Sequence, residues 1–492
     1  MMRTLEKTSN QIYELLFINF ILVFIVILSV VFVVNFCDVS FYSALFVYIP
    51  VMLLFFFLAN KNIYYGLVIL VAIVPIQPLF SMFISQYIDM MGAKVLVSIK
   101  ESMVFVLLVI ACTKNYYKVK LISVDYFLII FFIIYSIAFV LSDAPLFVRL
   151  VSYREGAMIV MIYFLGRYSN LQLKELKLLM LSMFLVASGV LAFGFVERFL
   201  VGESFWGYVG ALLYMELKFG VDNPGAWVMG GVPSQWYSYI GDVPYRRMVS
   251  SIGDAPTLSR YLAFSMLLSI VCYSVIISDK VGKIFIKYVV STLFFLAMLF
   301  SIGRGGLLIA LVGIMFFNFK YNKDMIFYIG LLILIFLVYM SVSGYIYSPV
   351  LSRHVAGLLG GMQSLLHDPF GIGLGTSGQM AVLYGEQKTG LVEESYVGSL
   401  AIQIGFSGVI SYVVFMVALI RYLSNTIKFV GGNAVGLISR FSSAFMFGVF
   451  LTSFLANSSI SPIVIINVLL VSGSIITIRE KVEHKYVQLQ KK

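Results

Sequence analysis

Long apolar runs recur along the whole 492-residue chain, and they constrain its fold more than any other feature. Each run is about 20 residues long, enough for a helix to cross a bilayer core of about 30 Å. The chain is 61% hydrophobic and 12% charged, with a mean hydropathy of +1.00, which a soluble protein of this length does not need. A transmembrane barrel would instead show alternating segments of about 10 residues. The sequence therefore predicts an all-α polytopic membrane protein.

The apolar runs predict about 14 membrane-spanning helices. The two short runs on either side of Arg304 are open to a second interpretation, as one broken helix pair. Neither an internal repeat nor a soluble domain is evident, so residues 1–492 are expected to form a single integral membrane domain. The helices are expected near residues 13–36, 41–59, 64–83, 95–112, 124–141, 156–168, 178–196, 257–278, 286–302, 305–319, 326–345, 395–420, 438–456 and 460–477.

Lysine and arginine are concentrated in every second loop between these runs. Cytoplasmic loops of membrane proteins carry an excess of these two residues, so both termini are predicted to lie in the cytoplasm. The formal net charge of +11 has the same explanation, because basic loops beside anionic lipid imply no nucleic-acid partner.

Three polar stretches are predicted on the opposite side of the membrane: residues 142–155, a large loop at 197–256, and a second large loop at 346–394. Stretches of this length are usually functional or disordered, and their aromatic and glycine content favours order. Aromatic side chains of the first large loop are expected to lie at the membrane interface. That loop holds all three tryptophans of the chain, Trp206, Trp227 and Trp236.

The second large loop and its flanks, residues 345–408, combine cations, carboxylates and a tight glycine run. The glycine run does not open a helix after a strand, so it does not fit a nucleotide-binding loop. It predicts a tight turn at which backbone approaches backbone or substrate. In chain order the motifs are Ser352-Arg353-His354, Pro369-Phe370-Gly371-Ile372-Gly373-Leu374-Gly375, Glu393-Glu394 and Gly405-Phe406-Ser407-Gly408.

Taken in order, these motifs resemble the C-terminal signature of the O-antigen polymerase and O-antigen ligase superfamily. Two upstream segments resemble the same family. The segment that runs from Arg247 to Pro256 is similar to an R-x-x-G-x-x-x-x-P motif before a membrane helix. The segment from Ser301 to Leu308, which contains Gly303-Arg304-Gly305, is similar to an S-R-G-x-L-L motif. The resemblance covers residues 245–460.

One departure from the family pattern separates its two branches. The ligases carry His-[Asn/Ser/Gln]-x9-Gly-x-x-Gly, and counting back from Gly405 and Gly408 places Glu394 at the histidine position. The chain keeps the spacing but lacks the ligase histidine, which favours the polymerase branch.

The resemblance implies a GT-C type glycosyltransferase architecture in a bacterial inner membrane. It implies transfer of a growing polysaccharide from undecaprenyl pyrophosphate to a new lipid-linked repeat unit, with inversion, on the periplasmic face. The expected partners are the lipid-linked oligosaccharide substrate, membrane lipids and a chain-length regulator. A ligase to lipid A core or protein is one alternative, and a flippase or other transporter of lipid-linked oligosaccharides is another.

Three residues are predicted to be catalytic, and a structural alternative stays open for two of them. Arg304 would contact the pyrophosphate, or would be an arginine that reaches the bilayer surface from an ordinary turn. Arg353 would hold phosphate oxygens through a bidentate contact that lysine cannot reproduce. Glu394 would accept the proton of the attacking hydroxyl, or would be an acid favoured at a helix start.

Five further residues are predicted to bind substrate. The paired arginines would hold phosphate or an acidic sugar, or would be solvated at the bilayer surface. Arg154 would contact substrate or pair with a neighbouring acid. The five are Arg246, Arg247, Arg154, His354 and Glu393.

No metal or other cofactor is expected. The sequence has no Asp-x-Asp element, and none of its three histidines forms a pair with metal-ligand spacing. It also lacks the Gly-x-x-x-x-Gly-Lys loop of ATP-driven proteins. A lipid-pyrophosphate donor is already activated, and arginines can stabilise its leaving group.

Overall fold

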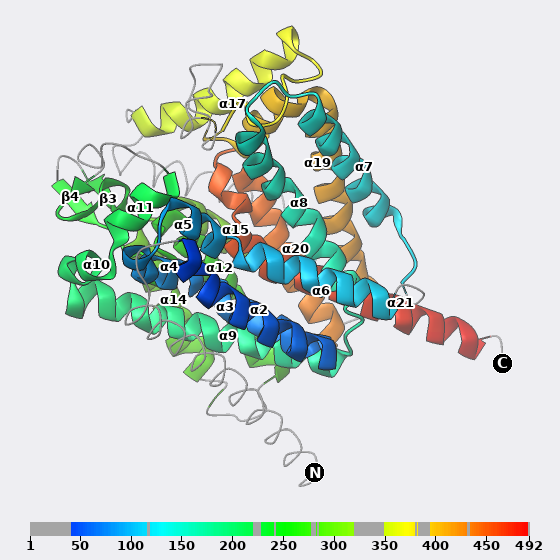
Figure 1. Ribbon diagram of the computed structural model, residues 1–492. Coiled ribbons are helices and arrows are strands. Elements are labelled where there is room, and N and C mark those ends of the chain that lie inside the picture. The colour runs from blue at the N-terminus through cyan, green and yellow to red at the C-terminus, as the bar shows by residue number, and fades with distance from the viewer. Residues whose placement is uncertain are drawn as a thin grey trace.

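A computed structural model of the chain describes residues 41–115, 119–219, 228–240, 243–276, 282, 285–318, 349–378, 381, 394–430 and 433–490. These residues are mostly helical, and the helices form one bundle with smaller elements at its edge (Figure 1). The spans predicted at 13–36 and 326–345 lie outside the described residues, as do Trp227 and Glu393.

The first part of the chain is a series of apolar helices joined by short connections. A span predicted at 64–83 is two helices, α3 and α4, bent by 62° at their junction. Proline cannot donate an amide hydrogen bond, and Pro75 and Pro78 lie at this break. The elements are α2 (Phe41–Lys61), α3 (Ile63–Ile73), α4 (Gln77–Ile84), the 3₁₀ turn η1 (Ser85–Tyr87), α5 (Met90–Val97), α6 (Ile99–Asn115), α7 (Ser123–Val140), α8 (Leu146–Tyr168) and α9 (Leu173–Val196).

The predicted loop at 197–256 folds into short helices and two antiparallel hairpins, β1–β2 and β3–β4. In the second hairpin Tyr237 pairs with Arg246 and Ile240 with Val243. The elements are the π-helix η3 (Glu197–Val201), α10 (Glu203–Val209), α11 (Ala211–Phe219), β1 (Val228–Met229), β2 (Val232–Pro233), the 3₁₀ turn η5 (Ser234–Trp236), β3 (Tyr237–Ile240), β4 (Val243–Arg246) and the 3₁₀ turn η6 (Ser250–Ile252).

This loop has its own small core, which holds two of its tryptophans, and the membrane-interface position expected for its aromatic side chains stays a prediction. Trp206 and Trp236 are fully buried, and their ring centroids are 4.8 Å apart. Met82 of α4 packs into the same core, which fixes the loop over the bent helix pair. The Tyr237 hydroxyl donates to Glu203 at 2.6 Å, and partial burial together with this carboxylate raises the pKa of Tyr237 to about 12. The parts of this loop that the structure describes are folded, as expected.

The C-terminal half supplies the centre of the bundle. Within their apolar stretches α12 is 78% buried and α21 is 83% buried, whereas α2 is 28% buried and lies at the edge. The elements are α12 (Ala255–Val271), the π-helices η7 (Cys272–Ile276) and η8 (Phe285–Val290), α14 (Ser291–Ser301), α15 (Arg304–Asn318), α17 (Pro349–His367), α19 (Tyr396–Val430), α20 (Ala434–Ser453), the 3₁₀ turn η10 (Asn457–Ile460) and α21 (Pro462–Gln490).

Eight helices in the described part of the chain are long and apolar enough to cross a membrane, or nine if the bent pair counts as one span. The prediction of a polytopic helical membrane protein is borne out at this level. Helix α8 differs most from expectation, because it begins at Leu146 and includes most of a stretch predicted as an outer loop. A search for apolar runs does not find the whole of this helix, because four charged residues interrupt it: Arg149, Arg154, Glu155 and Arg167.

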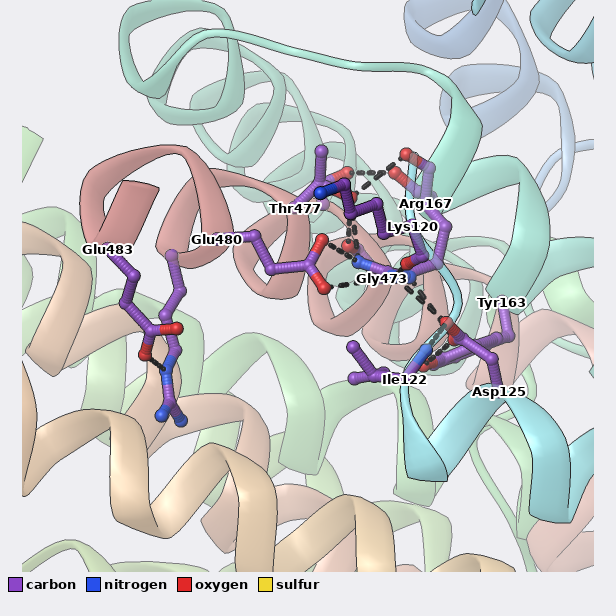
Figure 2. A network of polar contacts seen from close by, with 12 residues as sticks. Lys120, Ile122, Asp125, Tyr163, Arg167, Gly473, Thr477, Glu480 and Glu483 are labelled. Atoms are coloured by element: carbon purple, nitrogen blue, oxygen red, sulfur yellow. Dashed lines mark hydrogen bonds and ion pairs between the residues drawn. The ribbon is translucent and has the colours of Figure 1, made fainter. Parts of the chain in front are cut away.

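The polar end of α8 is anchored by an ion-pair network that joins α7, α8 and α21 (Figure 2). Arg167 and Asp125 are both fully buried, and the guanidinium donates to the carboxylate at 2.8 Å. A second carboxylate, that of Glu480, accepts from Arg167 at 2.9 Å. Tyr163 and Thr477 complete the network, at 2.7 Å from Asp125 and 3.2 Å from Arg167 respectively.

Loss of one partner in this network leaves an uncompensated charge in the bundle. Asp125→Asn or Arg167→Ala is therefore expected to cost about 3–5 kcal/mol of stability, seen as a lower melting temperature of the detergent-solubilised protein. Glu483→Gln is the matched control, because Arg479 and Glu483 are one helical turn apart on α21 and their ion pair is partly exposed. It should cost about 1 kcal/mol or less, and equal losses for both pairs would contradict the assigned role of burial.

Candidate functional site

The junction between α14 and α15 packs against α12 without room for side chains. Helix α14 ends at Ser301, and Arg304 is the first residue of α15. The Ser259 hydroxyl of α12 donates to the Gly303 carbonyl at 2.5 Å. A Cβ atom on Gly306 would overlap Ser259. The glycines beside Arg304 therefore allow the start of α15 to lie directly on α12.

Arg247 lies at the same junction, which brings together two motifs that are far apart in the sequence. Its guanidinium donates to the carbonyl of Ser301 at 3.0 Å and to that of Ile302 at 3.4 Å. A cation is favourable at a helix C-terminus, where carbonyl groups lack partners within the helix. Arg247 thus caps α14 and lies next to Arg304.

A third arginine, Arg260, was missed by the sequence analysis. Its side chain is 3% exposed, and a Cβ atom on Gly305 would lie 2.6 Å from its guanidinium. It donates to the Pro256 carbonyl at 3.0 Å, and it has no carboxylate within ion-pair distance in the described part of the chain. An arginine inside an apolar run is a signal for function, and Arg260 lies within the span predicted at 257–278.

Arg247, Arg260 and Arg304 together form what we call the arginine cluster, around the N-terminus of α15. The carboxylate of Asp254 acts on Arg260 through its charge, and it caps α12 by accepting from Thr257 at 3.0 Å. The first amide groups of a helix have no acceptor within the helix, and they carry partial positive charge. The arrangement therefore favours an anion such as phosphate.

Arg246 points away from this cluster into the core of the 197–256 loop. It forms an ion pair with Glu197, whose carboxylate is fully buried. The same carboxylate accepts from Trp206 at 3.1 Å and from the backbone amides of Val249 at 3.0 Å and Ser250 at 3.2 Å. Four donors thus surround one carboxylate and fix the end of the loop.

The two adjacent arginines are expected to differ in what they stabilise. Arg246→Ala leaves the Glu197 charge buried and should cost about 3–5 kcal/mol, with faster proteolysis of the loop. Arg247→Ala removes two hydrogen bonds to carbonyls and should cost about 1–2 kcal/mol. Melting temperature and limited proteolysis of the purified variants measure the difference. A larger loss for Arg247→Ala would reverse the assignment.

The predicted glycine turn is confirmed, and it pairs its backbone with a break in α19. The break is at Gly405, which has a φ of 69°. The amides of Ile372 and Gly373 donate to the carbonyls of residues 402 and 403 at 2.9 and 3.0 Å, and the amide of residue 406 donates to the Pro369 carbonyl at 2.9 Å. Positive φ at Gly371 and Gly373 makes this path accessible only to glycine.

A side chain at Gly371 is expected to break this pairing. Its φ is +79°, and a Cβ atom would lie 2.6 Å from the Gln403 backbone. Gly371→Ala should therefore cost at least about 1–3 kcal/mol, measured as a drop in melting temperature. Gly189→Ala is the control, because that exposed position in α9 has no atom within 4 Å of the added Cβ. It should be neutral or stabilising by about 0.5–1 kcal/mol, and a similar loss at both sites would argue against the close backbone approach.

A buried polar pocket lies behind this turn, between α7, α8, α19 and η10. Its walls include Glu155 of α8, and Ser377 follows the glycine turn in the chain. Other lining side chains are Tyr135, Tyr396, Gln403 and Asn457. We call this the polar pocket. Sequence analysis named the neighbouring Arg154 as a candidate but not Glu155.

Glu394 is half-buried beside this pocket. Its carbonyl accepts from the Asn457 amide at 2.5 Å, and Asn457 lines the pocket. The next residue, Ser395, accepts from the Gly398 amide at 3.0 Å and so caps the start of α19. Glu394 therefore lies at the helix start, as the sequence predicted.

The other predicted residues lie on different elements. Arg154 forms an ion pair with Glu101 of α6 at 3.7 Å, which matches the alternative that it pairs with a neighbouring acid. Arg353 and His354 belong to α17, but the structure does not describe their side chains. Figure 1 shows α17 lying across one end of the bundle, and it packs against α19.

The arginine cluster and the polar pocket lie at the same end of the bundle. Turn η10, which carries Asn457, packs against α12, α19 and α20. The N-termini of α12, α15 and α19 and the C-terminus of α20 therefore gather at this end. The fold and the two sites define a multi-pass helical membrane protein with a cationic site and a carboxylate-bearing pocket at one end.

The chain matches no protein-family model, and no curated protein matches it.

Proposed function

We propose that this protein is a membrane glycosyltransferase that polymerises lipid-linked polysaccharide repeat units, such as those of O-antigen. It transfers the growing chain from undecaprenyl pyrophosphate to a new repeat unit on the same lipid carrier. The arginine cluster is the observation that carries the proposal. Arg247 and Arg304, each from a segment that resembles the polymerase family, meet at the start of α15.

The chemistry of the reaction fits a cationic site without a metal. Cleavage of the bond to pyrophosphate leaves negative charge on the departing phosphate oxygen. Arginine binds such oxygens through two parallel hydrogen bonds, and the N-terminus of α15 adds positive potential. Arg353 is proposed to contribute from α17. A carboxylate at the same end is proposed to accept the proton of the attacking hydroxyl, and Glu394 is the candidate from the sequence.

The proposal also fixes an orientation. The end with the arginine cluster faces the periplasm of a bacterial inner membrane, and both termini lie in the cytoplasm. The architecture is of GT-C type with about 14 spanning helices, as the apolar runs predict. A chain-length regulator is a proposed protein partner.

The function is tested in cells by the glycan profile of Arg304 variants. Arg304→Ala is expected to abolish polymer while the protein still accumulates in the membrane, and Arg304→Lys should restore it only in part because lysine lacks the fork geometry. Arg440→Ala is the control, since Arg440 lies near the opposite end of the bundle and donates to the Phe317 carbonyl. It should make normal polymer.

The form of the remaining glycan separates the alternatives. Loss of a polymerase leaves single repeat units attached to the lipid core, whereas loss of a ligase or a flippase leaves none attached. A profile with no attached glycan in Arg304→Ala cells would therefore exclude the proposed function. Normal polymer in Arg304→Lys cells would exclude recognition of phosphate by a bidentate contact.

A further inference from the structure

The polar pocket is lined by a carboxylate, that of Glu155, which accepts no hydrogen bond from the residues that the structure describes. Glu155 lies within α8, nine residues after its start at Leu146. No described donor contacts its oxygens, and its neighbour Arg154 is directed to Glu101 on α6. A charged side chain at this depth usually faces a cavity and serves a function.

Two hydroxyl groups of the same pocket also lack partners. Ser377 is 2% exposed and Tyr396 is 5% exposed, and neither hydroxyl has a hydrogen-bond partner among the residues that the structure describes. A buried hydroxyl without a partner costs about 1–3 kcal/mol. A ligand group in the pocket would supply what these side chains lack.

Two other polar side chains of the pocket, Tyr135 and Gln403, are already engaged in hydrogen bonds. The Tyr135 hydroxyl donates to the Ser152 carbonyl at 2.8 Å, and Gly156 gives its ring room to lie against α8. Gln403 donates to Ser399 at 2.7 Å and accepts from the Gly375 amide at 2.8 Å. The pocket therefore offers one carboxylate that can accept a hydrogen bond and two hydroxyl groups that can each donate one.

An alcohol group matches this set. Its O–H can donate to Glu155 while its oxygen accepts from Ser377 or Tyr396. The pocket has a volume of about 20 Å³, enough for one group of the size of water but not for a sugar ring. A water molecule fits this volume, and of a saccharide only a single hydroxyl at its edge can enter.

We propose that the pocket receives the attacking hydroxyl of a saccharide acceptor and that Glu155 takes its proton. This inference rests on the proposed function. The hydroxyl oxygen forms a bond to the anomeric carbon of the donor while the bond from that carbon to the phosphate oxygen breaks. The electron pair leaves on the pyrophosphate beside the arginine cluster, and the proton passes to the Glu155 carboxylate.

Glu155 thereby replaces Glu394 as the base. The backbone carbonyl of Glu394 accepts from the Asn457 amide, which ties the start of α19 to the rim of the pocket. Tyr396 and Ser377 orient the attacking oxygen by donating to it.

The test is polymer formation by the purified protein from lipid-linked repeat units. Glu155→Gln keeps the shape of the side chain but removes its basicity, and it is expected to slow the reaction by about 10² to 10⁴. Tyr396→Phe and Ser377→Ala should each slow it by about tenfold or less, because each removes one hydrogen bond. Glu155→Ala should regain rate with added formate, which a purely structural role would not allow. Glu394→Gln should retain more activity than Glu155→Gln.

Glu175→Gln is the matched control, because that acid caps α9 by accepting from the Gln172 amide at 2.7 Å, at the opposite end of the bundle. It should keep the rate of the parent protein. An active parent with an equally active Glu155→Gln variant would overturn the inference alone. A parent that makes no polymer would overturn the proposed function, and the inference with it. A dependence on sodium that is lost in Glu155→Gln would assign the pocket to a cation and would also overturn the inference.

Discussion

Helix α8 carries four charged side chains through an apolar bundle, and the arrangement of its neighbours depends on how those charges are matched. At one end Arg167 holds α7 and α21 through Asp125 and Glu480. Nearer its start Arg154 pairs with Glu101 of α6. Ion pairs of this kind are poor evidence for net stability, but they fix one arrangement because a shifted helix would leave buried charges unpaired. Arg149 and Glu155 of α8 form no ion pair among the described residues, and Glu155 lines the polar pocket.

The apolar helices could be predicted because a membrane span needs about 20 apolar residues, and that signal is local. The same criterion failed at α8, since it treats Arg149 and Arg154 as loop residues and cannot see a distant partner such as Glu101. The same criterion says nothing about Trp206 and Trp236. Their aromatic character suits either an interface or a core, and only the packing of Met82 from α4 decides between the two.

The candidate site was predictable where short motifs carry it, as at Arg247 and Arg304. Their proximity was not, because the two segments are separated by the whole of α12 and α14. Arg260 lies within a predicted span and was passed over, although a charge in such a run is itself a signal. The polar pocket could not be predicted at all, because it combines residues of α7, α8, α19 and η10 that no pattern along the chain connects.

The turn that follows α17 has a consequence for biogenesis. Ser142, just after α7, donates to the Leu374 carbonyl at 2.6 Å, a contact that spans 232 residues of sequence, and the same turn pairs with α19. Membrane helices enter the bilayer as the chain is synthesised, so the first half is inserted long before Leu374 leaves the ribosome. The wall of the pocket that contains Ser377 therefore closes only when synthesis has passed α19. A partly made chain therefore carries Glu155 before the wall that shelters this carboxylate has been synthesised, so the pocket is completed late in assembly.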